Sequence, residues 1–70
     1  MMSKYEIIIF WSDEDKCFVA EMPELKGCTA HGETYLEALN EVQEVATNWL
    51  DIANEKGWAI PQAKGRLVFA

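Results

Sequence analysis

Residues Thr34 to Gly57 read TYLEALNEVQEVATNWLDIANEKG, and both ends of this stretch carry residues typical of helix caps. Thr34 and Glu37 have the spacing of a capping box. In such a box the threonine hydroxyl accepts from the third helical amide and the glutamate carboxylate reaches back to the cap amide. Gly57 can adopt the left-handed conformation that commonly follows the last turn of a helix. The spacing therefore predicts one helix from Tyr35 to Glu55 or Lys56.

The predicted helix is amphipathic. At about 100° per residue, apolar side chains gather on one side and polar side chains gather on the opposite side. The apolar side holds Tyr35, Leu39, Val42, Ala46, Trp49, Leu50 and Ala53, and the polar side holds Glu37, Glu41, Glu44, Asn48, Asp51 and Glu55. Val45 and Ile52 widen the apolar side along one flank, beyond what contact with a single sheet requires. We therefore expect a second packing partner at that flank.

Three strands are predicted before the helix. Residues 4–11, KYEIIIFW, are β-branched and aromatic, and the run is too short for a typical helix. A polar turn at 12–16 leads into a second strand at 17–22, which we expect to pair antiparallel with the first as a hairpin. The loop that follows contains a proline and a glycine, and residues 28–31 after it are predicted to form a short third strand.

The order of the elements predicts the fold class. After the helix, residues 58–65 form a connector interrupted by proline and glycine, and residues 66–69, RLVF, predict a last strand. The order β-β-β-α-β predicts an α+β fold, a small antiparallel-containing sheet with one amphipathic helix packed on one face. Because seventy residues are too few for two independent cores, we expect a single domain over residues 1–70.

The charge balance restricts the class of partner. Twelve acidic and six basic side chains give a formal net charge of −6. This charge disfavours direct binding to DNA or RNA and favours a basic partner. The N-terminus lacks the pattern of a signal peptide, and no apolar run approaches the ~20 residues of a membrane helix. We therefore expect a cytoplasmic protein that does not bind membranes.

The sequence predicts no catalytic residues, no metal site and no cofactor. Cys28 and His31 have the spacing of half a zinc site, but Cys17 offers only one further ligand. The same cysteine and histidine with an acid would make a minimal hydrolase, the least favoured of three functional hypotheses. The acids lie mostly on the outer helix face and in the turn, whereas two-metal chemistry needs acids that converge from different elements. A structural cysteine and a histidine at a strand end are the favoured interpretation.

An acidic surface on the helix is the first candidate binding site. Its acids are Glu37, Glu41, Glu44, Asp51 and Glu55, with no lysine or arginine among them. Like charges at this spacing repel by a few tenths of a kcal/mol per pair, and a cationic partner would relieve that repulsion. The alternative is a solvated face that keeps the protein soluble. The second candidate is a loop surface formed by Pro23, Glu24, Leu25 and Gly27.

Ordered segments over nearly the whole chain resemble the HicB family of antitoxins. The most specific are FVAEMPELKGC at 18–28, GET at 32–34 with EAL at 37–39, and IP at 60–61. The resemblance implies a partial ribonuclease-H-like fold without nuclease activity, in agreement with the predicted element order. It also implies a partner, HicA, a small basic toxin with a double-stranded-RNA-binding-like fold that cleaves messenger RNA.

The resemblance implies that this chain binds and neutralises such a toxin. Because a toxin that holds RNA phosphates must present lysine and arginine, we expect the acidic chain to cover its RNA-binding surface, without being an enzyme. Many HicB proteins carry a C-terminal DNA-binding module, and because we find none in this sequence we do not expect DNA binding. A homodimer or higher oligomer is implied, with candidate contacts at Val45, Ile52 and Phe69. The alternative hypothesis is an orphan oligomeric binding or regulatory module without a cognate toxin.

Overall fold

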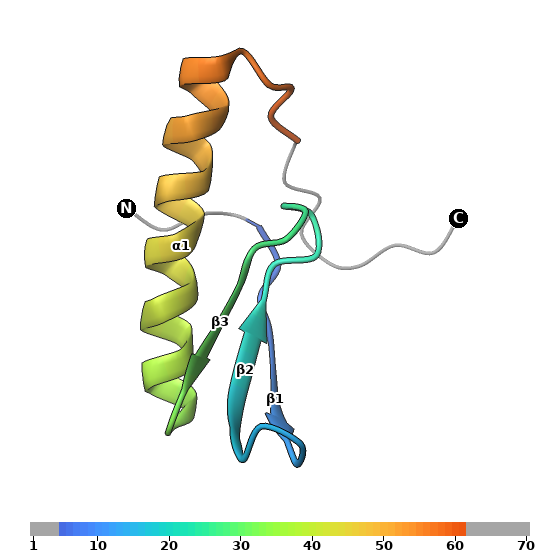
Figure 1. Ribbon diagram of the computed structural model, residues 1–70, viewed down its shortest axis with the longest axis vertical. Coiled ribbons are helices and arrows are strands. Elements are labelled where there is room, and N and C mark those ends of the chain that lie inside the picture. Colours follow the sequence, from blue (N-terminus) through green and yellow to red (C-terminus); the bar gives the residue numbers. More distant parts are fainter. Residues whose placement is uncertain (1–4, 62–70) are drawn as a thin grey trace, which may run out of the picture.

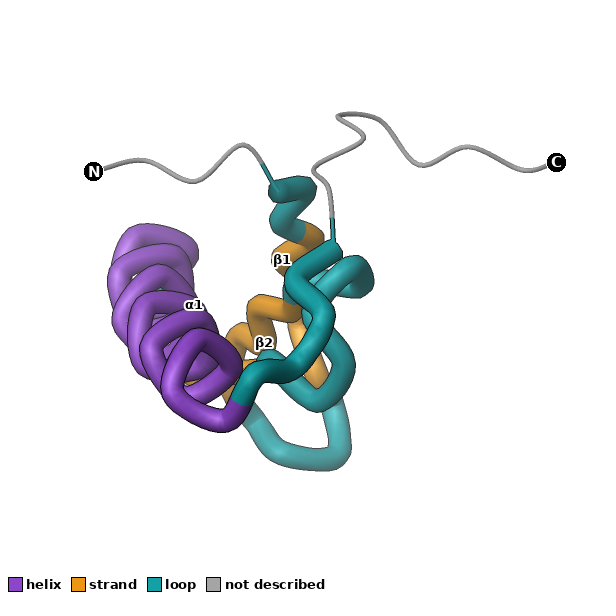
Figure 2. Tube along the Cα trace, turned by 90° about the horizontal axis from the view of Figure 1, so that it is seen from above, coloured by secondary structure: helices purple, strands orange, loops and turns teal. Residues whose placement is uncertain are grey.

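The computed structural model describes residues 5–61, which form a three-stranded sheet and one helix (Figure 1). The elements are β1 (Ile8–Ser12), β2 (Cys17–Glu21), β3 (Thr29–Gly32) and α1 (Tyr35–Lys56). The strands pair antiparallel in the order β1-β2-β3. The helix runs along one face of the sheet, as the view from above shows (Figure 2). The predicted α+β class is confirmed for the β-β-β-α part, and the strand predicted at 66–69 lies outside the described residues.

The strand bounds differ from the predicted ones because the pairing ladder stops before the loop after β2. The first pair of the hairpin joins Ile8 to Glu21. The following residue, Met22, instead donates its backbone N–H to the carbonyl of Cys28 at 3.0 Å, within the loop. The ladder between the first two strands therefore starts at Ile8, and β1 begins later than predicted.

The helix bounds agree with the prediction at both ends. The hydroxyl of Thr34 accepts from the backbone N–H of Glu37 at 3.0 Å. The Glu37 carboxylate accepts from the N–H of Glu33 at 2.7 Å, one residue before the amide expected for a capping box. At the other end Gly57 has a φ of 72°, and its N–H donates to the carbonyl of Ala53. Both ends are therefore set by hydrogen bonds local in sequence.

The core lies between the sheet and the helix. It is built from the buried residues Ala20, Met22, Leu25, Cys28, Ala30, Ala38, Val42 and Ala46. The many alanines keep the helix close to the sheet, and Gly32 is one point of close approach. A Cβ placed on Gly32 would lie 2.4 Å from the backbone nitrogen of Ala38. The helix therefore sits directly on β3.

One residue of the predicted apolar helix side is exposed. Tyr35 is 60% exposed, although its periodicity matches the buried residues further along α1. It occupies the first helical position, near the end of the sheet, and its ring contacts Phe18 with centroids 4.2 Å apart.

Within residues 5–61 no helix combines the length and hydropathy needed to cross a bilayer.

Candidate functional site

The acidic side of α1 is fully presented to solvent. The acidic stripe, Glu37, Glu41, Glu44, Asp51 and Glu55, is exposed at every position, opposite the buried residues of the same helix. The single basic residue of α1 is in its last turn. Glu37 is committed to the helix start through its hydrogen bond to Glu33. The other four acids form a row of negative charge along the helix, suited to a cationic surface.

An apolar flank adjoins this stripe. The flank consists of Val45 and Ile52, which lie two helical turns apart. Val45 is half-buried and packs against the core, whereas Ile52 is exposed. By helical spacing Val45 neighbours Glu41, and Ile52 neighbours Glu55. The flank is thus an apolar edge bordered by negative charge. Phe69, the third expected oligomer contact, lies outside the described residues.

The candidate loop surface loses one of its members. Leu25 is fully buried in the core, so its side chain is not available to a partner as expected from the sequence. Its backbone N–H donates to Met22 and its carbonyl accepts from Cys28, each at 3.0 Å. These bonds hold the loop in a turn that directs the side chain of Leu25 into the core. Pro23 and Gly27 are exposed.

The rest of the loop is fastened to neighbouring segments. Glu24, which is half-buried, accepts from the backbone N–H of Glu6 through Oε1 at 3.0 Å. The indole N–H of Trp49 donates to the carbonyl of Lys26 at 3.1 Å, which ties the loop to α1. The loop is therefore bonded to the segment before β1 and to α1, and its contact with a partner stays a prediction for Pro23, Glu24 and Gly27.

The structure does not bring together the residues of the hydrolase and zinc hypotheses. Cys28 is buried in the core, and burial raises the pKa of its thiol. His31 is exposed on β3, on the sheet face away from the helix, with Nε2 3.9 Å from Oδ2 of Asp15. Among the described residues, no three histidine, cysteine or acidic side chains are grouped to hold a metal ion. The thiol of Cys28 and the imidazole of His31 therefore lie on opposite sides of β3.

A second exposed surface was not expected from the sequence. The hairpin-end cluster, Trp11, Phe18 and Tyr35, brings together aromatic rings from β1, β2 and α1. The length of the polar turn was a usable signal, since it places Trp11 directly opposite Phe18 in the hairpin. The contribution of Tyr35 depends on where the helix starts over the sheet, which periodicity does not specify.

The sequence is similar to a described protein family and to two proteins of Synechocystis sp.. The model of the UPF0150-like family matches residues 2–61. The UPF0150 protein ssl0259 of Synechocystis sp. is 38% identical over 63 residues, which cover 90% of this chain and 85% of that protein. The UPF0150 protein ssr1258 of the same organism is 38% identical over 45 residues, covering 63% of this chain and 65% of that protein. No solved structure matches. The family match spans most of the sequence, and the chain belongs to the UPF0150-like family.

Proposed function

We propose that this chain is an antitoxin-like inhibitor of the HicB type that binds a small basic, messenger-RNA-cleaving toxin of the HicA type. The observation that carries the proposal is the acidic stripe, exposed along α1 and without a basic residue among its members. Membership of the UPF0150-like family and the β-β-β-α order support the resemblance to HicB antitoxins on which the identity of the toxin rests.

The physical basis of inhibition is competition for one basic surface. A toxin that cleaves RNA must present lysine and arginine to the phosphates. A row of carboxylates can occupy the same cations and exclude the RNA. No bond is made or broken by the inhibitor, so it acts by occlusion and not as an enzyme. The net charge of −6 would also speed the encounter with a basic protein.

The proposal includes a homo-oligomer in the cytoplasm. An apolar side chain that stays exposed on a helix favours cover by another protein surface, and Ile52 on the apolar flank is such a side chain. A second copy of this chain is the expected cover. If the protein has no toxin, the same flank supports the alternative function, an orphan oligomeric regulatory module.

The decisive experiment is co-expression with the basic chain encoded by the neighbouring reading frame. We expect the two proteins to co-purify and messenger-RNA cleavage by the partner to stop. Reversal of Glu41, Glu44 and Asp51 to lysine should weaken capture about tenfold or more at low salt and flatten its salt dependence. Unchanged binding would discard the stripe as the interface, and no co-purification of the wild type would favour the orphan module.

A charge-matched pair of variants separates the stripe from the overall charge. Glu41→Gln with Glu44→Gln raises the net charge by two on the stripe. Thr29→Lys with Ala59→Lys raises it by two at exposed positions elsewhere, on β3 and in the connector after α1. The first pair should weaken capture clearly more than the second. Equal losses would assign the effect to net charge alone.

A further inference from the structure

The hairpin-end cluster is an aromatic surface assembled from three elements. The rings of Trp11 and Phe18 meet edge to face with centroids 5.2 Å apart, and those of Phe18 and Tyr35 are 4.2 Å apart. The central ring is half-buried, whereas Trp11 is 49% and Tyr35 60% exposed. Large aromatic side chains that stay exposed as a group are typical of protein interaction sites.

The position of the helix explains this exposure. Phe18 lies opposite Gly32 in the β2–β3 ladder, and the backbone of α1 approaches the sheet closely at Gly32. The first turns of the helix therefore cover β3. Trp11 stands on β1, at the other edge of the sheet, where the helix does not cover it. The sheet face that holds the core thus continues into solvent at this end.

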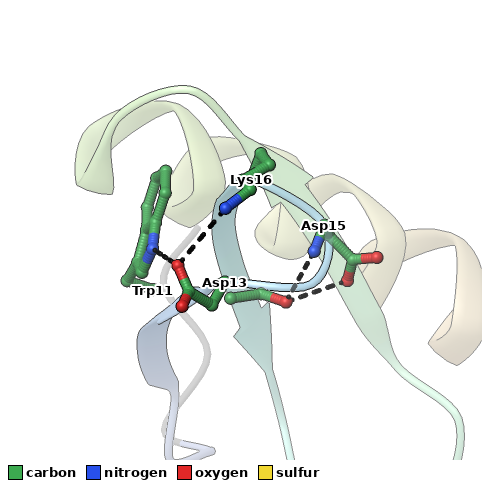
Figure 3. A network of polar contacts seen from close by, with 5 residues as sticks. Trp11, Asp13, Asp15 and Lys16 are labelled. Atoms are coloured by element: carbon green, nitrogen blue, oxygen red, sulfur yellow. Dashed lines mark hydrogen bonds and ion pairs between the residues drawn. The ribbon is translucent and has the colours of Figure 1, made fainter.

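The turn of the hairpin holds the indole of Trp11 in place (Figure 3). The indole N–H donates to Oδ1 of Asp13 at 3.2 Å, and the same oxygen lies 3.6 Å from the ammonium of Lys16. Ser12 and Asp15 bond to each other through their side chains at 3.1 Å, and Lys16 adopts a φ of 57° that closes the turn. The only polar atom of the indole is satisfied within the chain, so its remaining exposed surface is aromatic.

Negative charge surrounds this surface and selects the partner. The acids of the hairpin and helix start, all exposed, are Asp13, Glu14, Asp15, Glu33 and Glu37. Lys16 is the single lysine or arginine in the described hairpin and first helical turn. A second copy of this chain would bring an identical negative rim, and nucleic acid would bring phosphates, so like charge opposes both. A cation fits, because a π face and carboxylates both attract it.

We infer that the hairpin-end cluster is a docking surface for an arginine-bearing segment of a basic protein, separate from the acidic stripe. Arginine suits it better than lysine, since a planar guanidinium can stack on the indole of Trp11 while its N–H groups reach the carboxylate of Asp13 beside it. The inference rests on the proposed function in one respect, namely that the partner is a basic protein. The surface itself follows from the geometry of the hairpin.

Two peptides of equal length and charge test the surface without the toxin. Glycine alternates with arginine in one and with lysine in the other, and binding is followed by the indole N–H signals of 15N-labelled protein. The signals are assigned with Trp11→Phe, Trp49→Phe and Trp58→Phe variants. The Trp11 signal should move with the arginine peptide, and Trp11→Ala should weaken that binding about three-fold. The lysine peptide should bind less tightly.

The chain supplies a matched control. Trp58 is also 49% exposed and also meets another ring edge to face, but it follows the opposite end of α1. Trp58→Ala should leave arginine-peptide affinity unchanged. Asp13→Asn keeps an acceptor for the indole N–H and removes one rim charge, so it should weaken peptide binding in a protein that still unfolds cooperatively. A Trp11 signal that stays still, or equal effects of Trp11→Ala and Trp58→Ala, would overturn the inference.

The test also separates this inference from the proposed function. In a complex with the co-expressed basic partner, Trp11→Ala should raise the dissociation rate about tenfold. This ratio between variant and wild type should be nearly the same at high salt. A partner that dissociates from wild type and Trp11→Ala at the same rate overturns the inference alone. Absence of any captured partner, together with a Trp11 signal that responds to arginine, overturns the proposed function and supports the docking surface.

Discussion

Gly32 is a residue at which sheet and helix approach each other closely. Its own side chain is absent, and this absence lets the first turns of α1 rest on β3 while Phe18 fills the neighbouring position on β2. The exposure of Trp11 at the far edge follows from the same contact. The missing side chain of Gly32 thus permits the close contact between α1 and β3.

Replacement of Gly32 by alanine should be strongly destabilising. The new Cβ would meet backbone atoms of Glu37 and Ala38 at 2.8 and 2.4 Å, which a rotamer change cannot relieve. We expect a loss of about 3 kcal/mol in the free energy of unfolding, measured by denaturant titration. Gly27→Ala is the control, because Gly27 has a φ of 80° but open space around it. It should cost only about 1 kcal/mol, and a larger loss there than at Gly32 would contradict the packing argument.

Cys28 makes stability sensitive to alkaline pH. Burial raises the pKa of its thiol above the ordinary value of 9.0, so the folded protein keeps a proton that the unfolded chain releases. The contribution to stability is complete below pH 9 and is lost as pH rises through 9 and beyond. The free energy of unfolding of wild type should therefore fall more steeply above pH 9 than that of Cys28→Ala. Cys17→Ala is the control, and equal slopes for wild type and Cys28→Ala would contradict the prediction.

At the scale of single elements, α1 is defined by its caps. The hydroxyl of Thr34, the carboxylate of Glu37 and the left-handed Gly57 each satisfy or redirect backbone groups within a few residues of themselves. This locality is why the sequence alone could predict where the helix begins and ends. Strand β1 has no such local signal, and its start depends on the path of the loop after β2.

The hydroxyl of Thr34 is expected to contribute measurably to the stability of the protein. Thr34→Ala removes the acceptor of the Glu37 N–H and should cost about 1 kcal/mol of unfolding free energy. Thr34→Ser keeps an acceptor at the same place and should restore most of the loss. The measurement is thermal unfolding followed by far-ultraviolet circular dichroism. Equal stability of the alanine and serine variants would show that the hydroxyl is not the cap.

The candidate site was predictable only in part from the sequence. Helical periodicity identified the exposed acids, because burial on one side of α1 implies solvent on the other. It did not reveal that Leu25 is buried, since composition marked its loop as a turn and not as a piece of the core. Nor did it reveal the hairpin-end cluster, because that cluster depends on where along the sheet Tyr35 contacts Phe18.

In the molecule as a whole, like charge and exposed apolar surface have opposite effects on self-association. The net charge of −6 repels a second copy, whereas Ile52 on the apolar flank favours one. Added salt screens the repulsion and leaves the apolar contact intact. Self-association is therefore expected to strengthen with ionic strength, opposite to the salt dependence of binding to a basic partner.

Sedimentation at several protein concentrations checks this expectation. Wild type should shift from monomer toward dimer as concentration and salt increase. Ile52→Gln should move the equilibrium back toward monomer by removing apolar contact area. Leu36→Gln changes an equally apolar, exposed side chain on the other flank of α1 and should have little effect. A monomer at every concentration would contradict the oligomer.

The hydroxyl of Tyr5 donates a hydrogen bond to the carbonyl of Pro61, so the first and last described residues are neighbours. Because Tyr5 and Pro61 are neighbours, the segment between them can be reconnected without moving its core. A circular permutant of residues 5–61 would join Pro61 to Tyr5 through a linker and start at the turn between β1 and β2 instead. Such a protein would carry new termini beside Trp11, where a reporter dye or a crosslinker could be attached directly to the hairpin.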